Sequence, residues 1–191
     1  WEIIVVDDGS TDDTVTVVAE WCRLSGFRCV SLSRNFGKEA AITAGLSAAR
    51  GDAVIVLDGD LQHSPTLIRT MVGHWLGGAE VVYAVRQERD DESALKRAGT
   101  RLFYKLVNAS DRFALPEDAG DFRLMDRKVV NALLSLPERS RFMKGLYAWV
   151  GFPATGIPFE VGERAHGESK FRFRKLFSFA FDGLSSFSTV P

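Results

Sequence analysis

The sequence predicts an α/β fold in which helices flank a doubly wound parallel sheet. Short apolar runs rich in β-branched residues alternate with segments of helical periodicity, as in consecutive β-α units. The first run, residues 3–6, has the continuous apolar character of a strand buried on both faces. Acidic turns follow two of the runs, at Asp7-Asp8 and at Asp58-Gly59-Asp60. Such sheets bind ligands at the carboxyl ends of their strands, so we expect both acidic pairs at one functional edge.

The apolar periodicity gives the expected elements in order. We expect strands at residues 3–6, 29–32, 53–57 and 80–85, and helices at about 11–24, 36–49 and 65–76. Ser10 or Thr11 is expected to cap the first helix, and Pro65 to begin the third. The second half is less regular, with helices expected at 93–108 and 129–136 and strands at 122–125 and 157–161.

Size and composition indicate one globular domain. The chain has 191 residues, of which 46% are apolar and 26% charged, and its formal net charge is −1. That balance gives no electrostatic case for nucleic acid. Cys22 and Cys29 have neither metal-ligand nor C-x-x-C spacing, which favours reduced thiols in a reducing compartment. The three histidines are too scattered for a zinc site.

Asp58 and Asp60 are the first candidates for a metal site. Residues two apart in a strand point the same way, about 7 Å apart, where two carboxylates repel by roughly 2–3 kcal/mol. A divalent cation such as Mg²⁺ or Mn²⁺ relieves that repulsion and keeps positions open for phosphates. Gln62 can add a carbonyl ligand. The alternative is a solvated Asp-Gly turn that binds nothing.

The turn at Asp7-Asp8-Gly9-Ser10 also has two interpretations. One is an Asx-turn with a helix cap, which needs no ligand. In the other, a carboxylate binds the base or ribose of a nucleotide. Ser10 has no histidine partner in an activating pattern, so a serine nucleophile is not expected.

Seven motifs in order resemble family 2 glycosyltransferases, and more narrowly the polyprenyl-phosphate glycosyltransferases of the dolichyl-phosphate mannose synthase and bactoprenol glucosyltransferase type. The motifs are V-V-D-D-G-S at 5–10, S-R-N-F-G-K-E at 33–39, L-D-G-D-L-Q at 57–62, V-R at 85–86, A-G-D-F-R-L-M-D-R at 119–127, R-F-M-K-G-L at 141–146 and R-A-H-G-E-S-K-F at 164–171. Any single motif is only moderately specific, but seven in this order over essentially the whole chain are strongly specific.

The resemblance implies a GT-A type nucleotide-binding sheet and a set of site residues. Asp121 matches the family's catalytic base, and Asp58, Asp60 and Gln62 match its site for Mg²⁺ or Mn²⁺. Asp7, Asp8, Lys38 and Asp58 are expected to bind the nucleotide-sugar donor. The expected phosphate- and acceptor-binding residues are Arg86, Arg123, Arg164, Ser169 and Lys170. His166 lies beside them in sequence and is a weaker candidate.

The resemblance also predicts the domain organisation. We expect a catalytic domain at residues 1–162 that begins after the family's first strand. We expect an acceptor-side, juxtamembrane amphipathic segment at 163–191 that ends before transmembrane helices. Cations and Phe residues interleave at 170–177, which favours contact with anionic lipid headgroups. Packing of these Phe residues into the core is the plainer alternative, and stacking on nucleic acid is disfavoured.

The expected activity is inverting transfer of a hexose from a nucleotide-sugar to a polyprenyl phosphate at the cytoplasmic face of a membrane. UDP-glucose is the favoured donor, with GDP-mannose left open, and a homo-oligomer is also left open. One rival is a Mg²⁺-dependent aspartyl-phosphate phosphatase, which also uses D-x-D after a buried strand. The other is a non-catalytic membrane-associated scaffold with the same fold.

Overall fold

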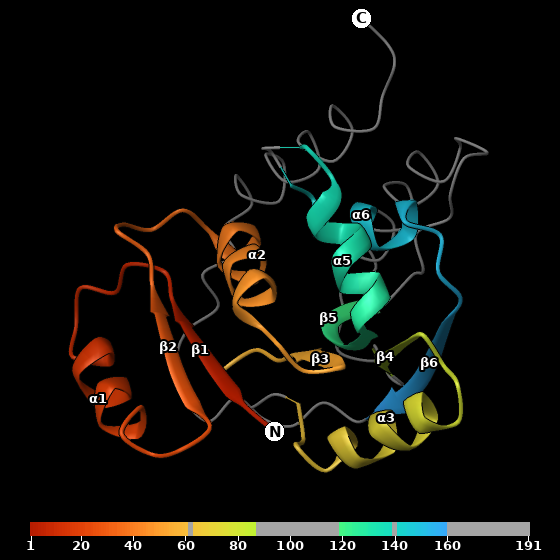
Figure 1. Ribbon diagram of the computed structural model, residues 1–191, viewed down its shortest axis with the longest axis horizontal. Helices are drawn as coiled ribbons and strands as arrows, with labels where there is room; N and C mark the ends of the chain where they lie inside the picture. Colours follow the sequence, from red (N-terminus) through yellow and green to blue (C-terminus); the bar gives the residue numbers. More distant parts are fainter. Residues whose placement is uncertain (61–62, 87–118, 139–140, 160–191) are drawn as a thin grey trace, which may run out of the picture. The chain divides into compact units, whose positions relative to one another are not determined.

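The computed structural model describes residues 1–60, 63–86, 119–138 and 141–159 (Figure 1). The chain forms two compact units. Unit 1 contains Trp1–Val54 and Asp126–Arg141, and unit 2 contains Ile55–Met125 and Phe142–Pro191. Each unit is therefore built from two separate stretches of sequence.

Unit 1 is built on a parallel pair of strands. Its elements are β1 (Ile3–Asp7), α1 (Thr14–Trp21), β2 (Phe27–Ser31), α2 (Lys38–Ala48) and α5 (Arg127–Ser135). β1 and β2 pair in register from Ile3–Phe27 to Asp7–Ser31. Figure 1 shows α1 beside β2 and α2 beside β1, on opposite sides of this pair. The carboxyl ends of both strands therefore lie at the same end of the unit.

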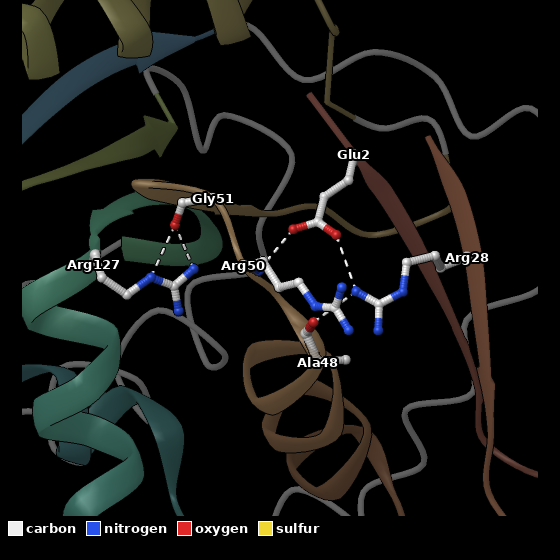
Figure 2. A network of polar contacts seen from close by, with 6 residues as sticks. All are labelled: Glu2, Arg28, Ala48, Arg50, Gly51 and Arg127. Carbon is white, nitrogen blue, oxygen red and sulfur yellow. Dashed lines mark hydrogen bonds and ion pairs between the residues drawn. The ribbon is translucent and has the colours of Figure 1, made fainter. Parts of the chain in front are cut away.

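A polar network fixes the opposite end of unit 1, where α2 ends (Figure 2). The Glu2 carboxylate accepts a 2.7 Å hydrogen bond from the Arg50 amide and pairs with Arg28 at 3.1 Å. Arg28 also donates to the Ala48 carbonyl at 2.8 Å, a favourable place for a cation because helix carboxyl ends carry negative partial charge. From α5, Arg127 donates to the Gly51 carbonyl through both Nε and Nη2.

Unit 2 holds most of a mixed sheet. Its elements are β3 (Ala53–Val56), which starts in unit 1, α3 (Leu67–Leu76), β4 (Val81–Arg86), β5 (Ala119–Asp126), α6 (Met143–Trp149) and β6 (Ala154–Phe159). The strand order is β3-β5-β4-β6, with β4 parallel to β6 and antiparallel to β5. In β5, both faces are covered, because Phe122, Leu124 and Met125 are fully buried.

Most of the expected strands and helices are confirmed within a few residues, but two expectations about the sheet are wrong. The sheet is not wholly parallel, because β5 runs against β4. β1 is not buried on both faces either, since Ile3 is 45% exposed and the sheet it forms has only β2 as a second strand among the described residues. An apolar run specifies a strand, but it specifies neither its direction nor its partners.

The first helix also departs from expectation. It begins at Thr14, and neither Ser10 nor Thr11 caps it. Instead the Asp12 carboxylate accepts hydrogen bonds from the amide and hydroxyl of Thr14. α6 was not expected as a helix at all. The helix expected at 93–108 lies outside the described residues. None of the helices that the structure describes is long and apolar enough to cross a membrane.

Candidate functional site

The turn after β1 shows what the first acidic pair does locally. Asp7 is 4% exposed, and its Oδ1 accepts a 3.1 Å hydrogen bond from the Ser10 amide. Its carbonyl accepts from the Leu32 amide just beyond β2 at 2.9 Å. Asp7 therefore stabilises the turn through the amide three residues on, one residue beyond the spacing of an Asx-turn.

Asp8 holds a second loop against this turn. Its two carboxylate oxygens accept hydrogen bonds from the backbone amides of Phe36 and Gly37, each at 2.8 Å. Gly9 has a φ of +70°, and a Cβ at Gly9 would lie 2.4 Å from the carbonyl carbon of Arg34. The loop at residues 34–37 therefore packs directly on the turn, and Asp8 fixes the entry to α2.

That loop carries exposed groups suited to a nucleotide. The Arg34 guanidinium lies over the Phe36 ring at 4.4 Å, and Phe36 is 50% exposed. Lys38, a predicted donor-binding residue, is exposed in the first turn of α2. Asp7, Asp8 and Lys38 thus belong to one end of unit 1. Their contact with a donor stays a prediction.

Asp58 and Asp60 lie in a turn that follows β3, because the strand ends at Val56. The argument from strand alternation was therefore wrong for this pair. Both side chains are half-buried. Among the described residues, no group of three His, Cys, Asp or Glu side chains could hold a metal. Two carboxylates with further positions for substrate phosphates are nevertheless the donor set that suits Mg²⁺ or Mn²⁺, so these residues fit such a cation.

Strand β5 is irregular at the position of the predicted catalytic base. Between the pairs Tyr83–Arg123 and Val85–Ala119, β4 advances by two residues while β5 advances by four. Asp121 lies in this bulged segment and is half-buried. Bulges of this kind are common beside active sites, where they redirect a side chain.

Arg123 is the most unusual charged side chain in unit 2. It is 5% exposed, and its Nη2 donates to the Gly120 carbonyl at 2.8 Å. Its Cζ lies 3.5 Å from the centroid of the Tyr147 ring, on α6. Burial lowers the pKa of Arg123, and the nearby Tyr147, Asp121 and Tyr83 side chains oppose that shift. The structure thus brings together the predicted pair of Asp121 and Arg123.

Two aromatic residues of unit 2 were missed by the sequence analysis. Tyr147, which stacks on Arg123, follows the R-F-M-K-G-L motif directly, and that adjacency was its only signal. The His63 ring lies 4.9 Å from the rings of both Phe122 and Phe159. It therefore joins the segment just after the D-G-D turn to β5 and β6.

Of the remaining predicted site residues, Arg86 alone lies within the described residues. Arg86 is the last residue of β4, in register with Phe159 of β6. Gln62, Arg164, Ser169 and Lys170 lie outside the described residues, as does His166. Their roles stay predictions.

Comparison with known proteins adds the family. The model of the glycosyl transferase family 2 matches residues 1–134. The chain belongs to this family. It is 47% identical to an uncharacterised glycosyltransferase of Synechocystis, covering all of this chain and 60% of the relative. It is 43% identical to the bactoprenol glucosyl transferase of Shigella phage SfV, covering all of this chain and 62% of that relative. This family 2 chain therefore spans about three-fifths of these curated relatives.

Solved structures of similar shape show the fold. A mannosyltransferase from Pyrobaculum calidifontis in complex with GDP-Man and Mn²⁺ matches with a TM-score of 0.62 and 21% identity, over all of this chain and 56% of that one. Glucosyl-3-phosphoglycerate synthase from Mycobacterium tuberculosis, with Mn²⁺, UDP-Glc and phosphoglyceric acid, matches with a TM-score of 0.59 and 23% identity, over 95% and 67%. The expected GT-A type fold is confirmed.

Proposed function

We propose that this family 2 chain transfers a hexose from a nucleotide-sugar to a polyprenyl phosphate, with inversion of configuration. The single observation that carries the proposal is the buried Arg123 beside Asp121 on the bulged part of β5. A buried guanidinium and a neighbouring carboxylate suit a phosphate acceptor better than a neutral sugar hydroxyl. The likeness to a bactoprenol glucosyl transferase over the whole chain supports the same acceptor class.

Within this proposal, each acidic turn has a separate task. Asp58 and Asp60, with Gln62, hold Mg²⁺ or Mn²⁺. When bound, that cation neutralises charge on the departing nucleoside diphosphate. Asp7 and Asp8 set the turn and loop that receive the nucleotide, and Lys38 adds a positive charge for its phosphates. Two solved neighbours hold Mn²⁺ together with a nucleotide-sugar, which supports a divalent cation in this proposal.

The acceptor oxygen attacks the anomeric carbon, the bond from that carbon to the diphosphate breaks, and one displacement inverts the configuration. A phosphate monoester has its second pKa near 6 and is largely deprotonated near pH 7. Asp121 therefore has little proton to remove, and we assign it mainly to orienting the acceptor and accepting any residual proton. Arg123 offsets the repulsion between the acceptor phosphate and the donor diphosphate.

UDP-glucose is the donor we favour, because the curated relatives named for an acceptor are glucosyl transferases. The test incubates the intact protein with Mn²⁺, a polyprenyl phosphate and UDP-glucose, GDP-mannose or UDP-galactose in turn. We expect lipid-linked hexose from UDP-glucose at a rate at least tenfold above the others. A preference for GDP-mannose would be consistent with hexose transfer to a polyprenyl phosphate but would contradict the assignment of glucose as the sugar.

Neither rival from the sequence analysis gains support. Family 2 membership disfavours the aspartyl-phosphate phosphatase. A non-catalytic scaffold would have the same fold but would transfer no sugar. Under that alternative, no metal-dependent binding of nucleotide-sugar is expected. Calorimetry of UDP-glucose binding with and without Mn²⁺ separates it from the enzyme.

A further inference from the structure

The Arg123 guanidinium is buried, and its one hydrogen bond to a carbonyl of the described residues is not enough to fix its orientation. Only Nη2 has a carbonyl partner given by the structure, on Gly120 of the same strand. Nε is buried and has no hydrogen-bond partner among the described residues. A guanidinium has five N–H donors, so most of its capacity remains for another group. The side chain is nevertheless almost completely removed from water.

An aromatic face supplies the missing constraint. The Tyr147 ring centroid lies 3.5 Å from the Arg123 Cζ, which is the separation of a stacked cation and ring. Stacking fixes the plane of the guanidinium and does not occupy the N–H groups at its edge, of which Nε has no hydrogen-bond partner among the described residues. Tyr83 faces Arg123 across the β4–β5 pair, and Gly156 leaves room beside Tyr83, since a Cβ there would lie 3.3 Å from the Tyr83 ring.

We propose that Tyr147 is a positioning residue that orients Arg123 to bind the phosphate of the acceptor. This inference rests on the proposed function and names a further residue of the same site. Tyr147 acts through Arg123 and touches no reacting atom. A planar guanidinium whose plane is fixed can meet two phosphate oxygens at once, which a freely rotating cation does less well.

Four single variants of the intact protein, and a double-mutant cycle with Arg123→Ala, test the role of the ring. Tyr147→Leu removes the aromatic face, and Tyr147→Phe keeps it. Trp149→Leu is the matched control, because it removes an aromatic residue that is 46% exposed on the same helix. Arg123→Lys keeps the positive charge but loses the planar group. Acceptor KM, donor KM and kcat are measured with polyprenyl phosphate and UDP-glucose, and thermal unfolding checks the fold.

We expect Tyr147→Leu and Arg123→Lys each to raise the acceptor KM at least tenfold, with less than a threefold change in donor KM. Tyr147→Phe and Trp149→Leu are expected to stay within twofold of wild type. In a chain that already carries Arg123→Ala, Tyr147→Leu is expected to change the acceptor KM by less than twofold. The reason is that the two substitutions remove the same contact, between the guanidinium and the ring.

Several results would overturn the inference. They are an unchanged acceptor KM in Tyr147→Leu, a rise confined to the donor KM, or an equal effect of Tyr147→Leu with and without Arg123. If Tyr147→Leu does not fold, Arg123→Lys provides the test. An acceptor KM of Arg123→Lys equal to that of wild type would show that binding needs no planar, stacked cation. A wild type that transfers no hexose to any polyprenyl phosphate overturns the proposed function itself, whereas an active wild type with unaffected variants overturns only the role of Tyr147.

Discussion

Arg123 shows how a single charged residue can be stable in the interior of unit 2. Removing an ion from water costs several kcal/mol even after relaxation of the surrounding protein. A desolvated cation–π contact such as that with Tyr147 returns about 2 kcal/mol, and a charged hydrogen bond such as that to Gly120 about 1.5–3 kcal/mol. The Asp121 carboxylate favours the charged form as well. The Arg123 guanidinium thus depends on two residues of its own strand and on Tyr147, which is distant in sequence.

Asp121→Asn tests the role of the carboxylate at this residue. We expect kcat at saturating acceptor to fall about 100-fold, because the carboxylate orients the attacking acceptor oxygen and a misplacement of about 1 Å can cost that much. Asp126→Asn on the same strand is the control, because Asp126 caps α5 and Asn caps equally well. Steady-state kinetics of both variants provide the measurement. An Asp121→Asn enzyme with most of its turnover would show that Asp121 is not catalytic.

Two glycines in the acidic turns are predicted to respond differently to the same substitution. Gly9→Ala places a methyl group 2.4 Å from the Arg34 backbone at positive φ, so we expect it to lower the free energy of unfolding by about 1–3 kcal/mol. Gly59 has open space around it and no positive φ. Gly59→Ala is expected to stay within about 0.5 kcal/mol. Urea unfolding of the two variants measures the difference, and equal destabilisation would contradict this account.

At the scale of elements, the network at the end of α2 joins segments from both stretches of unit 1. Glu2 directly precedes β1, Arg28 lies in β2 and Arg127 comes from α5 (Figure 2). The hydrogen bond from the Arg50 amide is the main cause that lowers the pKa of Glu2 below its ordinary value of 4.5, and Arg28 adds to it. The network is therefore strongest when Glu2 is ionised.

The pH dependence of unfolding follows from that lowered pKa. Because the folded state favours ionised Glu2, its stabilisation is complete above about pH 4.5 and is lost as pH falls through the lower folded value. We expect Glu2→Gln to be less stable than wild type at pH 7, and the difference to vanish as the solution is acidified. Glu20→Gln, an exposed change on α1, is the control. A difference that stays constant from pH 7 to pH 3 would contradict the assignment.

The elements also show how far the sequence could predict the fold. β-Branched runs and helical periodicity located the strands and helices of the first half, because those patterns reflect local burial. Neither pattern contains strand direction, so β5 was predicted as a strand but its antiparallel direction was missed. The bulge at Asp121 and the short helix α6 were also missed, since both depend on packing between distant segments. The acidic residues of the two turns were predictable because they come where strands end, and Asp121 was predictable only through the family motif. Tyr147 was not predicted.

At the scale of the whole molecule, the family and the fold agree with each other. The predictions about the domain boundary and the membrane concern residues outside those that the structure describes. The chain spans about 60% of the curated relatives it matches. The predicted boundary at residues 162–163 and the predicted lipid-facing segment both lie outside the described residues. Membrane association is therefore a separate prediction from the reaction.

Liposome flotation tests that separate prediction. The interleaved Lys, Arg and Phe residues at 170–177 are expected to bind anionic headgroups, at about 1 kcal/mol for each cation near the surface. We expect the intact protein to float with vesicles containing anionic lipid, and deletion of residues 171–191 to weaken flotation at least fivefold. Neutral vesicles are the control. Equal flotation with and without the segment would favour its packing into the core.

The central claim is that Asp58 and Asp60 support hexose transfer to a lipid phosphate. The most direct measurement is mass spectrometry of the lipid fraction after incubation of the intact protein with UDP-glucose, polyprenyl phosphate and Mn²⁺, for wild type and for Asp58→Asn and Asp60→Asn. We predict a polyprenyl-phosphate hexose from wild type, lost with a chelator and reduced at least 100-fold in both variants. A wild type that gives no such lipid, or variants that form it at the wild-type rate, would contradict the account.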